Sequence, residues 1–339
     1  MKNDTFQDLA NDLGLDRSTV SRAIRHCPGV DGGTRKKVLE AARQAGIQSA
    51  VNLCGVYCIM PDVPTYFWHT YHREIKEKLK KTGIPVRYSI YSKIYDSETV
   101  LMYLDDVIRS GARVLILTAV LSKEIREKLA DIQKNGVYVI LLSEYGELPN
   151  STYVGANSYQ DGERIGWWFC QRYPQHTPLI LNNIGGNANI SQRIDGFIHS
   201  LEQFNSSYAQ EIPVIRLNAN YFNNSRTVSA KYAALLDRMN GKYSCIYIPF
   251  GSIELPLSVV KAKKLTSIKL LFGHDCFTKA GINSLYPGYT ASCNQNIAHQ
   301  VDTAVELAAS YINDPVMPDS QTFRFIESKV CSSSKESIV

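Results

Sequence analysis

Long apolar runs are absent from this chain of 339 residues. The longest, such as Val114–Leu117 and Val137–Leu142, have the length of a β-strand, whereas a transmembrane helix needs about 20 apolar residues. No apolar stretch near residue 1 resembles a signal peptide. The sequence therefore predicts a cytoplasmic protein with no membrane partner.

A strong excess of either charge is also absent. The chain carries 37 Lys and Arg against 32 Asp and Glu, and residues 1–50 hold eight basic and six acidic side chains. No basic tail is present to attract nucleic acid without specificity. Any DNA binding must therefore depend on where individual positive groups point, and its affinity should fall as salt is added.

Catalytic motifs are missing as well. The sequence contains no Gly-x-Ser-x-Gly, no phosphate-binding loop and no HExxH, and Gly185-Gly186 is too weak to indicate a nucleotide site. His274-Asp275-Cys276 combines three reactive groups, but successive residues of an extended chain point to alternate faces. We therefore expect no enzyme activity and no cofactor.

The eight cysteines form no disulfide or metal-binding pattern. They are scattered, several lie within apolar runs, and buried reduced thiols are their expected state. Cys54 and Cys58 are separated by three residues, and no second pair follows at metal-binding spacing. The sequence predicts no metal site.

The first 46 residues, in contrast, are rich in helix signals. Thr5 can cap a helix over 6–13, and Gly14 suits the sharp turn that would follow it. Asp16 can cap a second helix over 17–24. A third helix is expected between Asp31, as its cap, and Gly46.

The second of these helices has two contrasting faces. Val20, Ala23 and Ile24 form an apolar stripe. The opposite face carries short polar and basic side chains, namely Arg17, Ser18, Ser21, Arg22 and Arg25. This arrangement is typical of a helix that reads DNA.

These residues resemble the lactose/galactose repressor family of bacterial transcription regulators. The likeness is carried by Thr5–Ala10, Gly14-Leu15, Ser18–Ala23 and Thr34-Arg35, followed by Val38, Ala41, Ala42 and Gly46. The resemblance implies a helix-turn-helix headpiece, whose second helix enters the major groove. It also implies an effector-binding core shaped like a periplasmic sugar-binding protein.

The same resemblance implies roles for the headpiece residues. Arg17 and Ser18 occupy the base-reading positions, and Arg17 could bond guanine with two donors. Thr19, Ser21 and Arg22 would hold phosphates or the helix frame. Thr5 and Arg25 complete the predicted DNA-binding set. The alternative is a small helical bundle whose arginines are only solvated.

Beyond residue 52 strand and helix signals alternate. Strands are predicted over 53–60, 85–91, 113–119, 137–142, 178–184, 212–217, 245–249 and 268–273. Helices are predicted near 69–82, 97–110, 122–135, 159–172, 191–205, 225–240, 252–264 and 295–313. Repeated βα units imply two lobes with doubly wound parallel sheets and ligand contacts at the carboxyl ends of the strands.

We therefore expect three regions. Residues 1–49 would form the all-α headpiece, and residues 50–330 a two-lobed α/β core that binds effector and dimerises. The lobes would interleave, with the chain crossing between them near 157, 288 and 318. Residues 331–339, rich in serine and charge, would be a disordered tail.

The resemblance extends to the core through Pro64–Trp68, Arg193–Phe197, Gly273–Asp275 and Gln295. It implies effector contacts from Arg193 and Asp275, because a guanidinium and a carboxylate can bind several hydroxyls of a sugar. The other candidates are Phe67, Trp68, Asn157, Phe250 and Gln295.

The aromatic candidates have competing interpretations. Phe67 and Trp68 could form an apolar platform for a sugar face, and plain core packing is an equal alternative. Phe250-Gly251 stands where the family carries Asn-Asp. An effector could therefore stack on Phe250 instead of bonding an asparagine.

Only six residues separate Gly46 from Leu53, too few for the hinge helix that the family inserts into the minor groove. We expect headpieces held more directly against the core. Together these features predict a homodimeric transcriptional regulator that binds a near-palindromic double-stranded operator under control of a sugar-like effector in the interlobe cleft. The alternative is a ligand-sensing binding protein whose headpiece no longer functions.

Overall fold

The computed structural model describes residues 6–24, 30–45, 54–63, 65–92, 96–176, 178–182, 187–204, 214–216, 225–239, 242–251, 254–264, 267–276, 285 and 288–333. Contacts divide the chain into two units. Unit 1 comprises Met1–Pro61, Ile75–Val154 and Val301–Arg324. Unit 2 comprises Asp62–Glu74, Gly155–Gln300 and Phe325–Val339.

Three helices open the chain: α1 (Phe6–Leu13), α2 (Arg17–Ile24) and α3 (Gly32–Gln44). They share a small apolar core built from Leu9, Ala10, Val20, Ala23, Ile24, Val38 and Ala42. Gly14, between α1 and α2, has a φ of 63°, a conformation that glycine adopts without strain. The predicted bounds of α1 and α2 are confirmed. Thr5, Arg25 and the linker over 46–53 lie outside the described residues.

Unit 1 contains a six-stranded sheet in the order β11-β5-β4-β3-β1-β2. Its strands are β1 (Val56–Pro61), β2 (Val86–Tyr91), β3 (Val114–Leu117), β4 (Tyr138–Leu142), β5 (Ser151–Gly155) and β11 (Thr322–Phe325). From β2 to β5 every neighbouring pair is parallel. Strands β1, β3, β4 and β5 are buried along their whole length, as expected for parallel strands covered on both faces.

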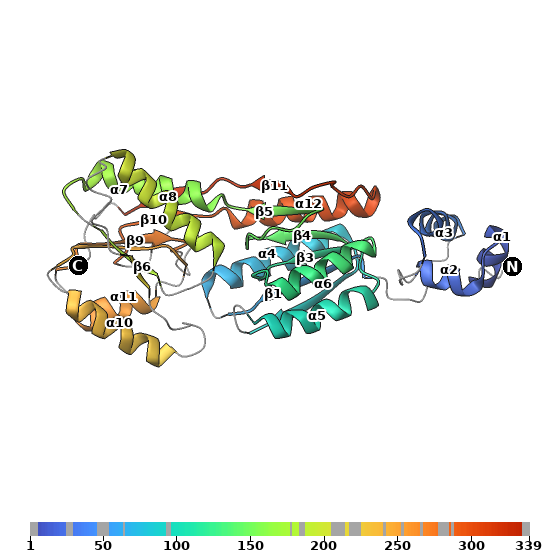
Figure 1. Cartoon of the computed structure of the whole chain (residues 1–339), viewed down its shortest axis with the longest axis horizontal. Coiled ribbons are helices and arrows are strands. Elements are labelled where there is room, and N and C mark those ends of the chain that lie inside the picture. Colours follow the sequence, from blue (N-terminus) through green and yellow to red (C-terminus); the bar gives the residue numbers. More distant parts are fainter. Residues whose placement is uncertain are drawn as a thin grey trace. The chain divides into compact units, whose positions relative to one another are not determined.

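The helices that follow these strands are α4 (Tyr66–Thr82), α5 (Ser97–Arg109), α6 (Lys123–Lys134) and, later in the chain, α12 (Ile297–Asn313). Helices α5 and α6 pack side by side (Figure 1). Their apolar stripes bury Leu104 and Leu129 against alternate residues of the strands, such as Ile59 and Leu115. Residues that recur about every 3.6 positions on the helices thus pack against every second residue of the strands.

Unit 2 contains a second six-stranded sheet in the order β12-β10-β9-β8-β6-β7. Its strands are β6 (Pro178–Asn182), β7 (Val214–Arg216), β8 (Cys245–Ile248), β9 (Leu270–His274), β10 (Ala291–Asn294) and β12 (Lys329–Ser332). All pairs are parallel except β12 with β10. Helices α7 (Ser158–Arg172) and α8 (Ala188–Phe204) lie on one side of this sheet, and α10 (Ser225–Met239) and α11 (Glu254–Ala262) on the other (Figure 1).

Helices α7 and α8 touch through glycine. A Cβ atom added to Gly162 would lie 2.1 Å from the carbonyl oxygen of Arg193, and one added to Gly196 would lie 2.0 Å from that of Tyr159. One turn further along, a Cβ on Gly166 would meet the Cβ of Ser200 at 2.7 Å. Only residues without side chains allow two backbones to approach this closely. The crossing sets where the side chains next to these glycines lie.

The predicted α/β class with parallel sheets is confirmed, and the alternating elements lie within a few residues of their predicted bounds. Four strands were missed: β5, β10, β11 and β12. They are short and contain small or polar residues, so no apolar run marks them. Cys331 and Ser332, assigned by the sequence to the tail, pair in β12 with Ser292 and Ala291. The predicted domain boundaries otherwise stay predictions.

Two further observations concern the whole described part of the chain. None of its helices is long and apolar enough to cross a membrane. Its seven cysteines are all free thiols, and six of them are buried. Cys27 lies outside the described residues.

The glycine crossing makes a first prediction. Gly162→Ala should lower the free energy of unfolding by about 1–3 kcal/mol, because the new methyl group meets backbone that cannot rotate away. In a helix without this clash, the same change would stabilise by up to about 1 kcal/mol. Urea denaturation would measure the change, with Gln160→Ala on the exposed face of α7 as control. A stabilised Gly162→Ala protein would contradict the close crossing.

Candidate functional site

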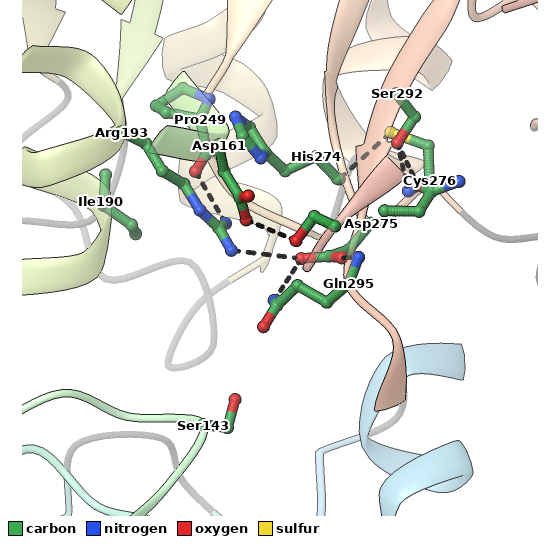
Figure 2. A network of polar contacts seen from close by, with 12 residues as sticks. Ser143, Asp161, Ile190, Arg193, Pro249, His274, Asp275, Cys276, Ser292 and Gln295 are labelled. Atoms are coloured by element: carbon green, nitrogen blue, oxygen red, sulfur yellow. Dashed lines mark hydrogen bonds and ion pairs between the residues drawn. The ribbon is translucent and has the colours of Figure 1, made fainter. Parts of the chain in front are cut away.

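Arg193 is the buried centre of a polar network in unit 2. Its side chain comes from α8, and one guanidinium nitrogen, Nη1, donates to the carbonyl oxygen of Pro249 at 3.1 Å. A second nitrogen, Nη2, lies 3.4 Å from Oδ2 of Asp275 (Figure 2). Its Nε is buried and has no hydrogen-bond partner among the described residues. The N–H on Nε is therefore a donor without an acceptor among the described residues.

Asp275 directly follows β9, and Gln295 directly follows the neighbouring strand β10. Because these strands are parallel, their carboxyl ends meet at one edge of the sheet. The backbone N–H of Gln295 donates to Oδ1 of Asp275 at 3.0 Å, and its side-chain Nε2 donates to Oδ2 at 2.8 Å. Asp275 has a φ of 51°, an uncommon value outside glycine that its hydrogen bonds hold in place.

The network continues beyond Gln295. Nε2 of Gln300 donates to Oε1 of Gln295 at 3.1 Å, and the hydroxyl of Tyr71 donates to Oε1 of Gln300. These bonds fix which way the Gln295 amide points, so that its nitrogen faces Asp275. The predicted residues Arg193, Asp275 and Gln295 are thus brought together in one hydrogen-bonded chain.

Asp161 is a second buried carboxylate of this region, and no sequence motif predicted it. It lies on α7 next to Gly162, accepts from Arg164 at 3.1 Å and accepts from the hydroxyl of Ser328 at 2.7 Å. A signal was available, because Asp161 falls on the stripe of α7 that also carries the buried Ile165. An acidic residue at such a position indicates a buried polar contact.

The buried charge of Arg193 and those of Asp275 and Asp161 stabilise one another. Burial alone would lower the pKa of Arg193, but Asp275 and Asp161 together outweigh it and raise that pKa. Burial raises the pKa of Asp161 against the opposing effect of Arg193. Arg193 therefore stays a cation at neutral pH, and it stabilises the carboxylates beside it.

His274 and Cys276, on either side of Asp275, have separate partners. A ring nitrogen of His274, Nε2, lies 2.7 Å from the hydroxyl of Tyr247, and burial moves the pKa of His274 well below its usual value. The thiol of Cys276 is hydrogen-bonded to the backbone oxygen of His274. The three residues do not bond one another through their reactive groups, as their alternation along the chain predicted.

The remaining effector candidates occupy packed positions in unit 2. Trp68 is 6% exposed and contacts the rings of Phe67 and Tyr71. Phe250 is 2% exposed within the apolar core. The side chain of Asn157 caps α7 by accepting from the backbone N–H of Gln160. Ligand roles for these four residues stay predictions.

The predicted DNA-binding residues lie on α2. Arg17, Ser18 and Arg22 are exposed, whereas Thr19 and Ser21 are half-buried. Val20, Ala23 and Ile24, on the opposite face, are buried. The two faces that the sequence indicated are present, and the contact with DNA stays a prediction.

Chemically, the network offers hydrogen-bond donors and acceptors at one edge of a sheet. The guanidinium and the Gln295 amide donate, and the Asp275 carboxylate accepts. A carboxylate and a guanidinium side by side suit a neutral molecule with several hydroxyl groups, since each hydroxyl both donates and accepts.

Comparisons with known proteins agree with this architecture. Residues 56–314 match the family model described as periplasmic binding protein domain. Among solved structures, the Caulobacter myo-inositol binding protein bound to myo-inositol is similar with a TM-score of 0.69 and 18% identity, over 85% of this chain and 96% of that one. No curated protein matches the sequence.

Two transcriptional regulators are similar over more of the chain. A LacI family regulator from Silicibacter pomeroyi has a TM-score of 0.65 and 16% identity, covering 98% of this chain and 99% of its own. The transcriptional regulator CelR, solved as a cellobiose complex, has a TM-score of 0.62 and 15% identity, over 96% and 98% respectively. At these identities the likeness concerns the fold.

The buried charge network makes a second prediction. Arg193→Met should lower the free energy of unfolding by about 3–5 kcal/mol, because it leaves buried carboxylates without their cation. Arg87→Met, which removes an exposed ion pair with Asp106, should cost no more than about 1 kcal/mol. A double-mutant cycle with Asp275→Asn, read by urea denaturation, should show coupling between positions 193 and 275. Strictly additive losses would refute the ion pair.

Proposed function

We propose that this chain, which belongs to the periplasmic binding protein domain family, is a DNA-binding transcriptional regulator whose operator affinity is controlled by a small polar ligand. The ligand is a sugar or a sugar derivative, bound by Arg193, Asp275 and Gln295. One observation carries this proposal: a buried guanidinium beside a buried carboxylate, with its Nε unpartnered among the described residues.

The chemistry of the network supports the ligand class. Hydroxyl groups of a sugar can accept from Arg193 and donate to Asp275, which replaces the hydration that burial removes. Similar proteins solved with myo-inositol or cellobiose are consistent with this class.

The three N-terminal helices support the DNA-binding part. Helix α2 buries an apolar stripe and exposes Arg17, Ser18 and Arg22, as a helix that enters the major groove must do. The two similar regulators cover 96% and 98% of this chain, whereas the inositol-binding protein covers 85%. The longer matches are the ones expected if residues 1–45 act as a headpiece.

A homodimer is part of the proposal. One headpiece attracts DNA weakly, because the first 50 residues of the chain carry eight basic and six acidic side chains. Two headpieces on a near-palindromic operator would add their contacts. Ligand binding would then change operator affinity to the extent that the DNA-bound dimer and the free dimer differ in their affinity for the ligand.

The small net charge of the headpiece also favours a second candidate, a ligand-sensing protein that does not bind DNA. A footprinting experiment on the DNA upstream of its own gene, at two salt concentrations, separates the two. A regulator protects a defined segment, and the protection weakens as salt rises. A sensor without DNA activity protects none.

The ligand site is tested by thermal-shift screening against monosaccharides, disaccharides, polyols and their phosphates. At least one neutral sugar or polyol should raise the melting temperature. Asp275→Asn should weaken the affinity for that ligand by about 10- to 100-fold, the loss expected when a hydrogen bond to a charged group is removed. Titration calorimetry would measure it.

The control for that change is Asp195→Asn, an exposed acidic residue on α8. It should bind like the unaltered protein. Circular dichroism should verify that each variant is folded. If Asp275→Asn does not fold, Gln295→Leu takes its place in the binding experiment. Undiminished binding in a folded variant at position 275 or 295 would exclude this site.

The headpiece assignment is tested at Arg17. Arg17→Ala should weaken operator binding by about 1–3 kcal/mol and relax the base preference at one position. Lys37→Ala, which removes an exposed basic group on α3, should leave that preference intact. Gel-shift titrations on operator and on random DNA would measure both. An equal loss on the two DNAs would mean that Arg17 contacts phosphates only.

A further inference from the structure

A second cluster of buried groups in unit 2 shares Asp161 with the network around Arg193. A carboxylate oxygen of Asp161, a ring nitrogen of His274 and the sulfur of Cys293 all lie within 4.8 Å of one another. All three side chains are buried. Carboxylate, imidazole and thiolate are ligands that a transition-metal dication binds in proteins.

The sheet brings two of these side chains together. His274 is the last residue of β9, and Cys293 lies directly opposite it on the parallel neighbour β10. Side chains at paired positions of parallel strands project from the same face. Asp161 reaches this face from α7, which covers it.

The hydrogen bonds of His274 leave one ring nitrogen available. Nε2 is 2.7 Å from the hydroxyl of Tyr247, and that hydroxyl is 3.5 Å from the carbonyl oxygen of Arg193. The hydroxyl can therefore accept from Nε2–H while donating to the carbonyl. In this arrangement Nδ1 carries a lone pair, and it is buried without a hydrogen-bond partner among the described residues.

A metal ion bound at Nδ1 of His274 would give this buried nitrogen the partner that it lacks among the described residues. A histidine that ligates a metal usually donates its other N–H to a fixed partner, and Tyr247 occupies that position. The other ring nitrogen, Nδ1, would then be the ligand atom of His274.

We propose that Asp161, His274 and Cys293 bind a zinc ion. Mixed carboxylate, nitrogen and sulfur ligands suit this dication, and three protein ligands leave one tetrahedral position for water. Binding converts the thiol of Cys293 to a thiolate, and its proton leaves to solvent. Because His274 precedes Asp275, the ion would also hold the end of β9 from which Asp275 extends.

Complete burial of the ligands determines how the test is done. The ion must enter while the chain folds, so the full-length protein is produced in medium supplemented with zinc or with cobalt(II) in its place. About one equivalent of zinc per chain is expected by elemental mass spectrometry. The cobalt protein should show a thiolate-to-metal charge-transfer band and the intense visible bands of four-coordinate cobalt.

Matched cysteine variants assign the ligand. Cys293→Ser should lose the charge-transfer band and most of the zinc. Cys276→Ser removes another buried thiol, which lies outside the cluster, and should keep both. Tyr247→Phe, which removes the partner of Nε2, should weaken zinc affinity by about 10- to 100-fold in a competition with a chromogenic chelator.

The outcomes are decisive even if a variant fails to fold. A cobalt-grown unaltered protein without a thiolate band, or a zinc-grown one with no stoichiometric zinc, overturns the proposal. So does a band that persists in Cys293→Ser, or one that disappears in a Cys276→Ser protein shown by circular dichroism to be folded. X-ray absorption of the zinc protein should show one sulfur ligand among nitrogen and oxygen, and a shell without sulfur contradicts the site.

Discussion

The charge of Arg193, enclosed within unit 2, is the constraint on which the surrounding structure depends. A buried guanidinium is tolerated only when acidic partners and hydrogen-bond acceptors surround it, because the free energy of removing it from water is large. Asp275, Asp161 and the carbonyl of Pro249 supply those partners from three different elements. Helix α8, helix α7 and the ends of β8 and β9 are therefore held in one arrangement.

The glycines of α7 and α8 make this arrangement possible. Gly162 and Gly196 let the two backbones touch, and the neighbouring Asp161 and Arg193 are carried into the same buried region. The close packing of α7 and α8 would also favour specific ligand binding, because hydrogen-bonding groups whose positions are fixed before binding lose little entropy when the ligand arrives. The strained backbone of Asp275 fits this view, because strain persists where surrounding contacts over-determine a residue.

The candidate site was predicted in part. Arg193, Asp275 and Gln295 were found through short matches to a family, and the structure joins them in one hydrogen-bonded chain. Asp161, Tyr247 and Gln300 were missed, because none belongs to a motif, and Asp161 and Tyr247 also come from segments far from Asp275 in the sequence. Asn157 was predicted as a ligand contact on its position alone, and its side chain caps α7.

The sequence by itself determined many of the elements: the bounds of α1 and α2, and the alternation of most strands with amphipathic helices. These depend on caps, turns and periodicity, which act over a few residues. Only the tertiary structure decided the order of the strands, the pairing of β12 with β10 and the meeting of Asp161, His274 and Cys293. Those features arise from contacts between distant segments, whose energies depend on how closely backbones approach and on which polar groups are buried together.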